Sequence, residues 1–140
     1  MLSDLILEHN GKATANRVLD ADIQKRETTV TAMGKIRGLE VSIIITYWNM
    51  PRSDNSHGPT TYYYGEGKGV ISILGDSNET ATVTEYGVGK SLGHKTVWRG
   101  SAIYRSTGNK LSFLNNLIGI FETEVDNLSS DVNEKVWEWR

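Results

Sequence analysis

A carboxylate on an apolar strand face is the first feature of this sequence that points to chemistry. Glu85 follows Ala81 and Val83 at alternate positions, so one face of a β-strand would carry two apolar side chains and an acid. Inside a protein, loss of water would raise the pKa of such a carboxyl unless Arg99 or Lys68 paired with it. We expect Glu85 to orient a ligand or, in an enzyme, to move a proton; a structural role is the simpler interpretation.

A second pair of acids, Glu122 and Glu124, stands two positions apart. On a strand the two side chains would share a face at a separation of roughly 6–7 Å, which suits acid–base catalysis. The intervening series Phe121, Thr123 and Val125 would occupy the opposite face. We therefore expect the two glutamates to face solvent, and we assign no catalytic residue.

The spacing of the histidines does not indicate a metal site. His9, His57 and His94 are far apart, and no His-x-His or His-x3-His pair exists. The chain has no cysteine, which excludes disulfides and thiolate chemistry. His57 lies in the longest polar loop, at 52–59, where a functional lid and a plain solvated loop are both open. No nucleophile has an obvious base, and no cofactor is predicted.

Aromatic side chains are the best candidates for the lining of a cavity. Trp98, Gly100, Ala102 and Tyr104 alternate on one predicted strand face, where small residues leave room beside the rings. Further rings that suit the same lining are Tyr47, Trp48, Tyr63, Tyr86 and Phe121. An ordinary aromatic core fits these residues equally well.

The elements that must position these residues are strands. β-Branched and aromatic residues cluster in runs bounded by Gly, Asn, Asp and Ser, and no convincing helical spacing appears. The runs are Ala13–Ala21, Arg26–Ile36, Glu40–Trp48, Thr60–Leu74, Glu79–Val88, Lys95–Ser106, Lys110–Asp126 and Val132–Arg140. Within the seventh run, Leu111–Gly119 does not alternate, and we expect a bulge or a short helical turn there.

Glycines favour a barrel over a sandwich. Gly65, Gly67 and Gly69 share one face of one strand, where three missing side chains would let the strand coil sharply. Val70–Ile73 continues as a strand, so this is not a phosphate-binding loop before a helix. We predict one all-β domain over residues 1–140, a closed antiparallel barrel of about eight strands with an interior that suits packed side chains or one small ligand.

The composition argues against nucleic acid and anionic membranes as partners. The net charge is −2, with 15 basic and 17 acidic residues interspersed, and no basic stripe suits nucleic acid or an anionic membrane. The first residues lack the pattern of a signal peptide, and no apolar run is long enough to span a membrane. We therefore expect a cytoplasmic location. Apolar residues on both faces near Trp137 and Trp139, and at Ile43–Ile45, predict a homo-oligomer.

The second half, from Thr60 to Arg140, resembles a group of small uncharacterised archaeal and bacterial proteins with a calycin-like barrel, of which the allene oxide cyclase barrel is a distant relative in shape. The residues that carry the resemblance are Gly65-Glu66-Gly67-Lys68-Gly69, Trp98-Arg99-Gly100-Ser101 with Tyr104, Leu114-Asn115-Asn116 with Gly119, Phe121-Glu122, Glu124-Val125-Asp126 and Trp137-Glu138-Trp139. The resemblance implies a closed, lipocalin-like antiparallel barrel, is compatible with an oligomer, and assigns no activity.

Three functions follow as hypotheses. The leading one is the binding of a small apolar or amphipathic molecule in the barrel interior. Its expected contacts are Tyr63, Trp98, Tyr104 and Phe121 as walls, with Glu85 or Arg99 at a polar end. The alternatives are an isomerase or cyclase that acts on an apolar substrate through Glu85, and a filled barrel that serves as an oligomeric interaction module.

Overall fold

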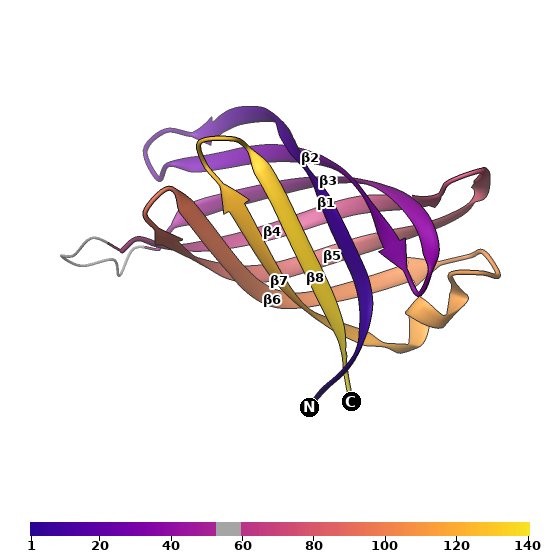
Figure 1. Ribbon diagram of the computed structural model, residues 1–140. Helices are drawn as coiled ribbons and strands as arrows, with labels where there is room; N and C mark the ends of the chain where they lie inside the picture. Colours follow the sequence, from indigo (N-terminus) through magenta and orange to yellow (C-terminus); the bar gives the residue numbers. More distant parts are fainter. Residues whose placement is uncertain (53–59) are drawn as a thin grey trace.

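The computed structural model describes residues 1–52 and 60–140 and is almost entirely β-structure. The strands are β1 (Leu2–Asp20), β2 (Lys25–Ile36), β3 (Leu39–Pro51), β4 (Tyr62–Ile73), β5 (Asp76–Leu92), β6 (Lys95–Ser106), β7 (Ile118–Asp126) and β8 (Asp131–Trp139). Each strand pairs antiparallel with the next, and β8 pairs with β1, so the sheet closes into a barrel (Figure 1). The predicted fold class, a closed antiparallel barrel, is confirmed.

The first strand departs most from the sequence prediction. We expected it over Ala13–Ala21, whereas β1 begins at Leu2. The pairing of β1 with β8 shifts register twice before Leu7, and the consecutive residues Ile6 and Leu7 are both buried. Because such bulges break the alternation of side chains, the period of two that identifies a strand is absent from this part of the sequence.

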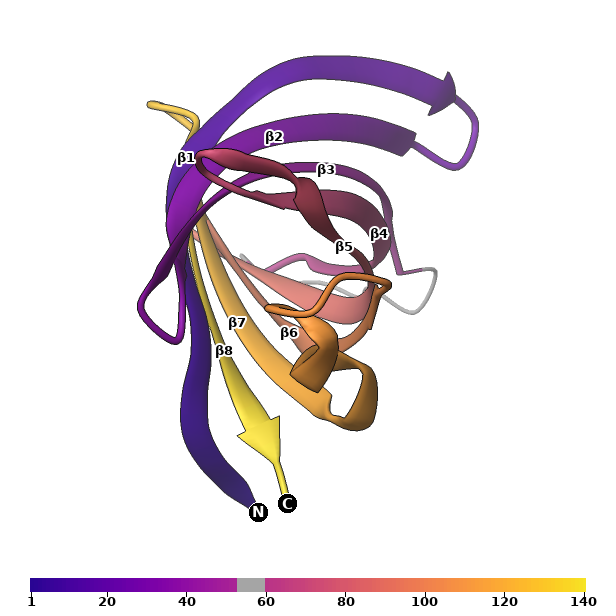
Figure 2. The same cartoon turned by 90° about the vertical axis from the view of Figure 1, so that its right-hand side faces the viewer.

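A short helix lies where the seventh predicted run loses its alternation. The 3-10 helix η1 spans Ser112–Asn116, between β6 and β7. Leu111 and Leu114 are fully buried and belong to the hydrophobic core. Figure 2 faces the end of the barrel where this helix lies. The expectation of a bulge or helical turn over Leu111–Gly119 is therefore confirmed as a helical turn.

The barrel interior has two different ends. Near η1 and the chain termini, aliphatic side chains fill it, among them Ile36, Val41 and Ile71, each fully buried. Toward the other end the inward side chains become aromatic and polar. No helix in the described ranges is long and apolar enough to cross a membrane.

Inward-facing glycines let large rings lie against the barrel wall. A Cβ atom on Gly67 would lie 2.5 Å from Cδ1 of Tyr47, and one on Gly65 would lie 3.0 Å from the Trp98 ring. The first distance is shorter than real Cβ contacts, and the second is tighter than most of them. The Gly65–Gly69 series therefore faces the interior, and it makes room there for aromatic rings as well as for strand curvature.

Candidate functional site

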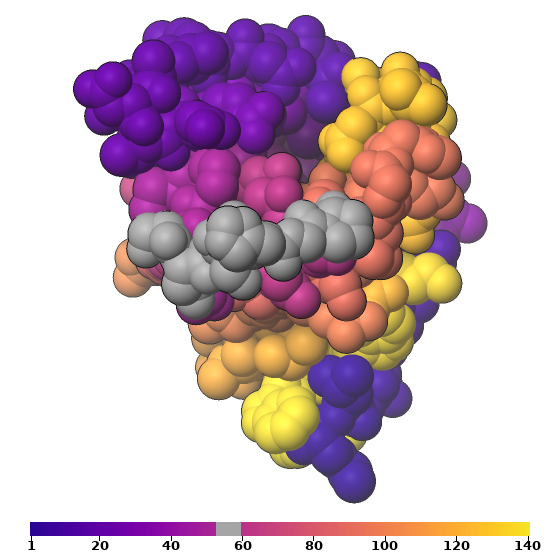
Figure 3. All heavy atoms as spheres, turned by 90° about the vertical axis from the view of Figure 1, so that its left-hand side faces the viewer, coloured from indigo at the N-terminus to yellow at the C-terminus, as the bar shows by residue number. Residues whose placement is uncertain are grey.

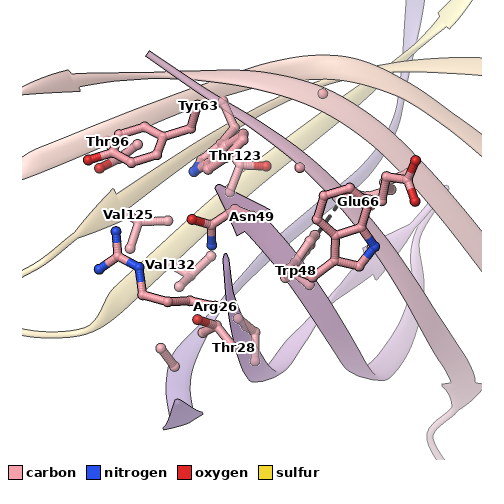
Figure 4. Close-up of a pocket in the computed structure, with 18 of the residues that line it drawn as sticks. Arg26, Thr28, Trp48, Asn49, Tyr63, Glu66, Thr96, Thr123, Val125 and Val132 are labelled. Atoms are coloured by element: carbon pink, nitrogen blue, oxygen red, sulfur yellow. Dashed lines mark hydrogen bonds between the residues drawn. The ribbon is translucent and has the colours of Figure 1, made fainter. Parts of the chain in front are cut away.

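A cavity of about 450 Å³ opens at the end of the barrel opposite η1. Figure 3 looks onto this end, where the β1–β2, β5–β6 and β7–β8 turns gather. The mouth residues are polar and include Asn16, Arg26, Asn49, Asp126 and Asn127. Figure 4 shows Arg26 and Asn49 together with Val125 and Val132, so the mouth leads to an apolar wall.

Aromatic rings form much of the cavity wall. Trp98 of β6 lies beside Tyr63 of β4, with ring centroids 6.1 Å apart. Glycines on β5 leave the space that two of these rings occupy. A Cβ on Gly89 would lie 2.8 Å from Trp98, and one on Gly87 would lie 2.8 Å from Phe121. These two glycines therefore fix where the Trp98 and Phe121 rings lie, and the space left between the rings is the cavity.

The inner part of the cavity is acidic. Glu85 of β5 lines it and is only 2% exposed. The Tyr47 hydroxyl donates a hydrogen bond to Glu85 Oε2 at 3.4 Å, and the charge of a second carboxyl, Glu134 of β8, acts on Glu85. Burial, then the charge of Glu134, raises the pKa of Glu85 well above its ordinary value, and the Tyr47 hydrogen bond opposes this rise. Glu85 therefore favours keeping its proton.

Behind Glu85 the polar cluster continues across the barrel. Glu134 accepts a hydrogen bond from Thr123 Oγ1 at 2.5 Å, and its other oxygen lies 2.7 Å from His9 Nε2. The side chains of His9 and Glu134 are both fully buried. Because these residues come from β1, β7 and β8, the closing seam of the barrel is what brings them together.

Tyr104 lies close to the same acids. Burial, followed by the charges of Glu85 and Glu134, raises the pKa of Tyr104 well above its ordinary value, so its hydroxyl keeps its proton. In the described part of the chain, the Tyr104 hydroxyl and His9 Nδ1 are buried without a hydrogen-bond partner. The cluster thus keeps unused hydrogen-bonding capacity, which is uncommon for buried polar atoms.

Most of the residues expected from the sequence to line a cavity do so. Tyr63, Glu85, Trp98 and Phe121 line it, whereas Tyr104 is buried outside its lining. Arg99 is a correction, because its side chain lies outside the barrel, 73% exposed, with Nε 3.0 Å from Glu122 Oε2. Alternation requires this position: Trp98 faces inward, so its neighbour faces outward.

Sequence reasoning missed Arg26, His9 and Glu134. Glu134 alternates with Val132 and Val136, the same signal that marked Glu85, and it could have been found. His9 was hidden by the irregular register of β1, which masks the alternation around it. Arg26 was assigned only to the start of a strand, and its place at the cavity mouth depends on the pairing of β2 with β3.

The other candidate groups lie on the surface or outside the described residues. Glu122 pairs with Arg99, and Glu124 Oε1 lies 2.7 Å from Lys95 Nζ, which fits the expected solvent face. His94 is 52% exposed and lies 3.7 Å from Asp126. His57 lies outside the described residues. Within residues 1–52 and 60–140, no group of three or more acids and histidines has the arrangement to hold a metal ion.

Comparison with known proteins gives the fold alone. No family model matches the chain, and no curated protein matches it. A crystal structure of a protein with unknown function from Clostridium acetobutylicum ATCC 824 is similar, with a TM-score of 0.75 over 96% of each chain. The two sequences are 8% identical, which shows a shared fold and no more. This likeness supports a closed eight-stranded barrel and does not single out the calycins or the allene oxide cyclases.

Proposed function

We propose that this protein binds a small amphipathic molecule inside its barrel. The observation that carries the proposal is the cavity of about 450 Å³, which is walled by aromatic rings and reaches the buried carboxyl of Glu85. Small-molecule sites are commonly concave, mostly apolar, about 300–1,000 Å³ in volume, and provided with a few polar groups that fix orientation. The cavity has this volume, and its wall combines aromatic rings with polar side chains.

We expect each part of the ligand to lie against a different group of cavity side chains. An apolar body would lie between Tyr63, Trp98 and Phe121, where ring faces replace water. A polar group at the inner end would reach Glu85. The outer end would meet the polar mouth, where Arg26 carries a positive charge.

A native mass spectrum of the protein purified from cells tests the proposal. We expect an excess mass per subunit that is lost on denaturation. Val125→Trp, which places a large ring in the cavity, should abolish this excess mass, and the matched control Val70→Trp on the outer face should keep it. An excess mass that survives Val125→Trp in a folded protein would show that the ligand binds elsewhere.

A second candidate function is an isomerase or cyclase on an apolar substrate. The observation that favours it is the presence of two buried carboxyls, Glu85 and Glu134, of which Glu85 lines the cavity. A carboxyl with a raised pKa, as Glu85 has, can give a proton to a substrate and take one from it. Glu85→Gln would then abolish turnover of the retained compound and leave its binding intact; unchanged turnover would remove the enzyme hypothesis.

The outer surface supports the proposal of a homo-oligomer. Ile118 of β7 is paired with Trp139 of β8, and Trp139 with Leu2 of β1. The three side chains are 48%, 52% and 50% exposed, and they form a continuous apolar strip across the barrel seam. Sedimentation at micromolar concentration tests this proposal: we expect an oligomer that Trp139→Lys dissociates, and a monomeric natural protein would contradict it.

A further inference from the structure

We propose that the molecule bound in this cavity carries a positively charged amine at its inner end, held by Glu85 and the surrounding aromatic rings. This inference rests on the proposed function and adds the chemical class of the ligand. It depends on which hydrogen-bonding groups the inner cavity offers, which charges surround Glu85, and what the walls are made of.

The carboxyl of Glu85 keeps hydrogen-bond acceptors free for a ligand. The Tyr47 hydroxyl donates to Glu85 Oε2, and the Thr123 hydroxyl donates to Glu134 Oε1. A carboxylate has about four lone-pair sites, and the Tyr47 hydroxyl occupies one of those on Glu85. The remaining lone pairs of Glu85 can accept hydrogen bonds, and a ligand with N–H donors satisfies them.

No fixed cation competes for Glu85 inside the cavity. Side chains face Glu85 or its partner from β3 (Tyr47), β6 (Tyr104), β7 (Thr123) and β8 (Glu134), and His9 of β1 lies beyond Glu134. On β4 the position opposite Glu85 is a glycine. Arg26 is the sole lysine or arginine among the described lining residues, and it belongs to the mouth.

The aromatic walls suit a cation as well as an apolar body. Tyr47, Tyr63, Trp98 and Phe121 line the same cavity as Glu85. An ammonium group within about 6 Å of a ring centroid is attracted by the negative face of the ring, and this attraction is stronger where water is excluded. A carboxylate among aromatic rings is therefore a site for an organic ammonium ion.

Binding of an ammonium ion would change the protonation of Glu85. Without ligand and below its raised pKa, Glu85 holds a proton. When R–NH3+ takes its place beside Glu85, Glu85 releases that proton to solvent, and the carboxylate and the ammonium remain as an ion pair. Binding should therefore release a proton below the raised pKa of Glu85 and strengthen as the pH rises through that pKa.

Isothermal titration calorimetry with three naphthalene probes tests this inference on the full chain. The probes share one ring system: 1-naphthylmethylammonium, 1-naphthalenemethanol and 1-naphthoate. At neutral pH we expect the ammonium probe to bind at least about tenfold more tightly than the alcohol. Titrations in two buffers of different ionisation enthalpy should show proton release for the ammonium probe and none for the alcohol.

A pair of matched variants locates the effect. Glu85→Gln should reduce the preference for the ammonium probe to about twofold or less and abolish proton release. Glu122→Gln removes the same charge from the outer face of β7 and should keep both. If Glu85→Gln does not fold, proton release by the natural protein decides the question alone.

Each of the other outcomes contradicts the amine inference, the proposed function or both. If the alcohol binds and the ammonium probe binds no more tightly, the amine inference is wrong and the proposed cavity function stands. If none of the three probes binds the folded protein, the proposed function fails and the inference fails with it. A preference for the cation that survives in folded Glu85→Gln would place the recognition of charge elsewhere, for example at Asp126.

Discussion

The two ends of the barrel interior are built from the same strands but differ in the side chains that fill them. Near η1 the interior is filled by aliphatic side chains, and Leu111 and Leu114 are fully buried in this core. At the other end the same strands carry rings, glycines and a chain of buried polar groups around a cavity. One end therefore resembles an ordinary hydrophobic core, and the other keeps costly polar groups and empty volume that a barrel built only for stability would lack.

This comparison explains why closure matters to the site. The polar cluster joins Tyr47, Glu85, Thr123, Glu134 and His9, which come from five different strands. Its last contact, between His9 and Glu134, crosses the seam where β1 meets β8. The aliphatic end holds the strands in register, and the cluster depends on that register.

The largest effect is expected from a change at the aliphatic end. Leu114→Ala removes a fully buried side chain from η1 and should lower the free energy of unfolding by about 2–5 kcal/mol, because it leaves a cavity in a packed region. Urea unfolding measures this loss. The control Leu128→Ala, at a position 81% exposed, should change stability by less than about 0.5 kcal/mol. An equal loss in both variants would mean that η1 does not close the core.

How well the sequence predicts the inward-facing residues depends on how regular each strand is. Where alternation is regular, as along β5, β6 and β7, it identified the inward faces that hold Glu85, Trp98 and Phe121. Where bulges interrupt it, as in β1, it gave neither the strand nor His9.

The cavity itself depends on packing across the barrel. Its space is left where aromatic rings lie against glycines of other strands, and no local sequence pattern gives that volume. The pairing of His9 with Glu134 joins residues 125 positions apart, so only barrel closure brings them together. Arg99 shows the opposite case, because strict alternation already placed it outside the barrel.

The second effect concerns pH and belongs to the polar end. The pKa of Glu85 is raised above its ordinary value of 4.5, so the folded protein keeps a proton that the unfolded chain gives up above about that pH. The free energy of unfolding should therefore fall as the pH rises from about 4.5 through the folded pKa of Glu85, by at most about 1.4 kcal/mol per pH unit.

Glu85→Gln should remove that fall, and the control Glu122→Gln should retain it. Urea unfolding at a series of pH values measures both. Asp126 and Asp131 have lowered pKa values, so their stabilising contributions are already complete above about 3.8 and fall in a separate pH window. A natural protein whose stability stays flat or rises above pH 4.5 would show that Glu85 holds no extra proton in the folded state.

The smallest effects come from one substitution made at two tyrosines. Tyr47 donates its hydroxyl to Glu85, whereas the buried Tyr104 hydroxyl has no partner among the described residues. Tyr47→Phe should lower the free energy of unfolding by about 0.5–1.5 kcal/mol, because a hydrogen bond to a buried acid is lost. Tyr104→Phe should leave stability unchanged or raise it by about 1 kcal/mol, because it removes a buried polar group that is unsatisfied.

Urea unfolding of the two variants side by side gives the sign of each change. Opposite signs would show that the cluster ends at Glu85 and Glu134 and that Tyr104 adds only a desolvated hydroxyl. Loss of stability in both would mean that Tyr104 is satisfied in solution, for example by a buried water between its hydroxyl and the acids. The polar end would then extend past Glu85 toward the aliphatic end, and the boundary between the two regions would lie deeper in the barrel.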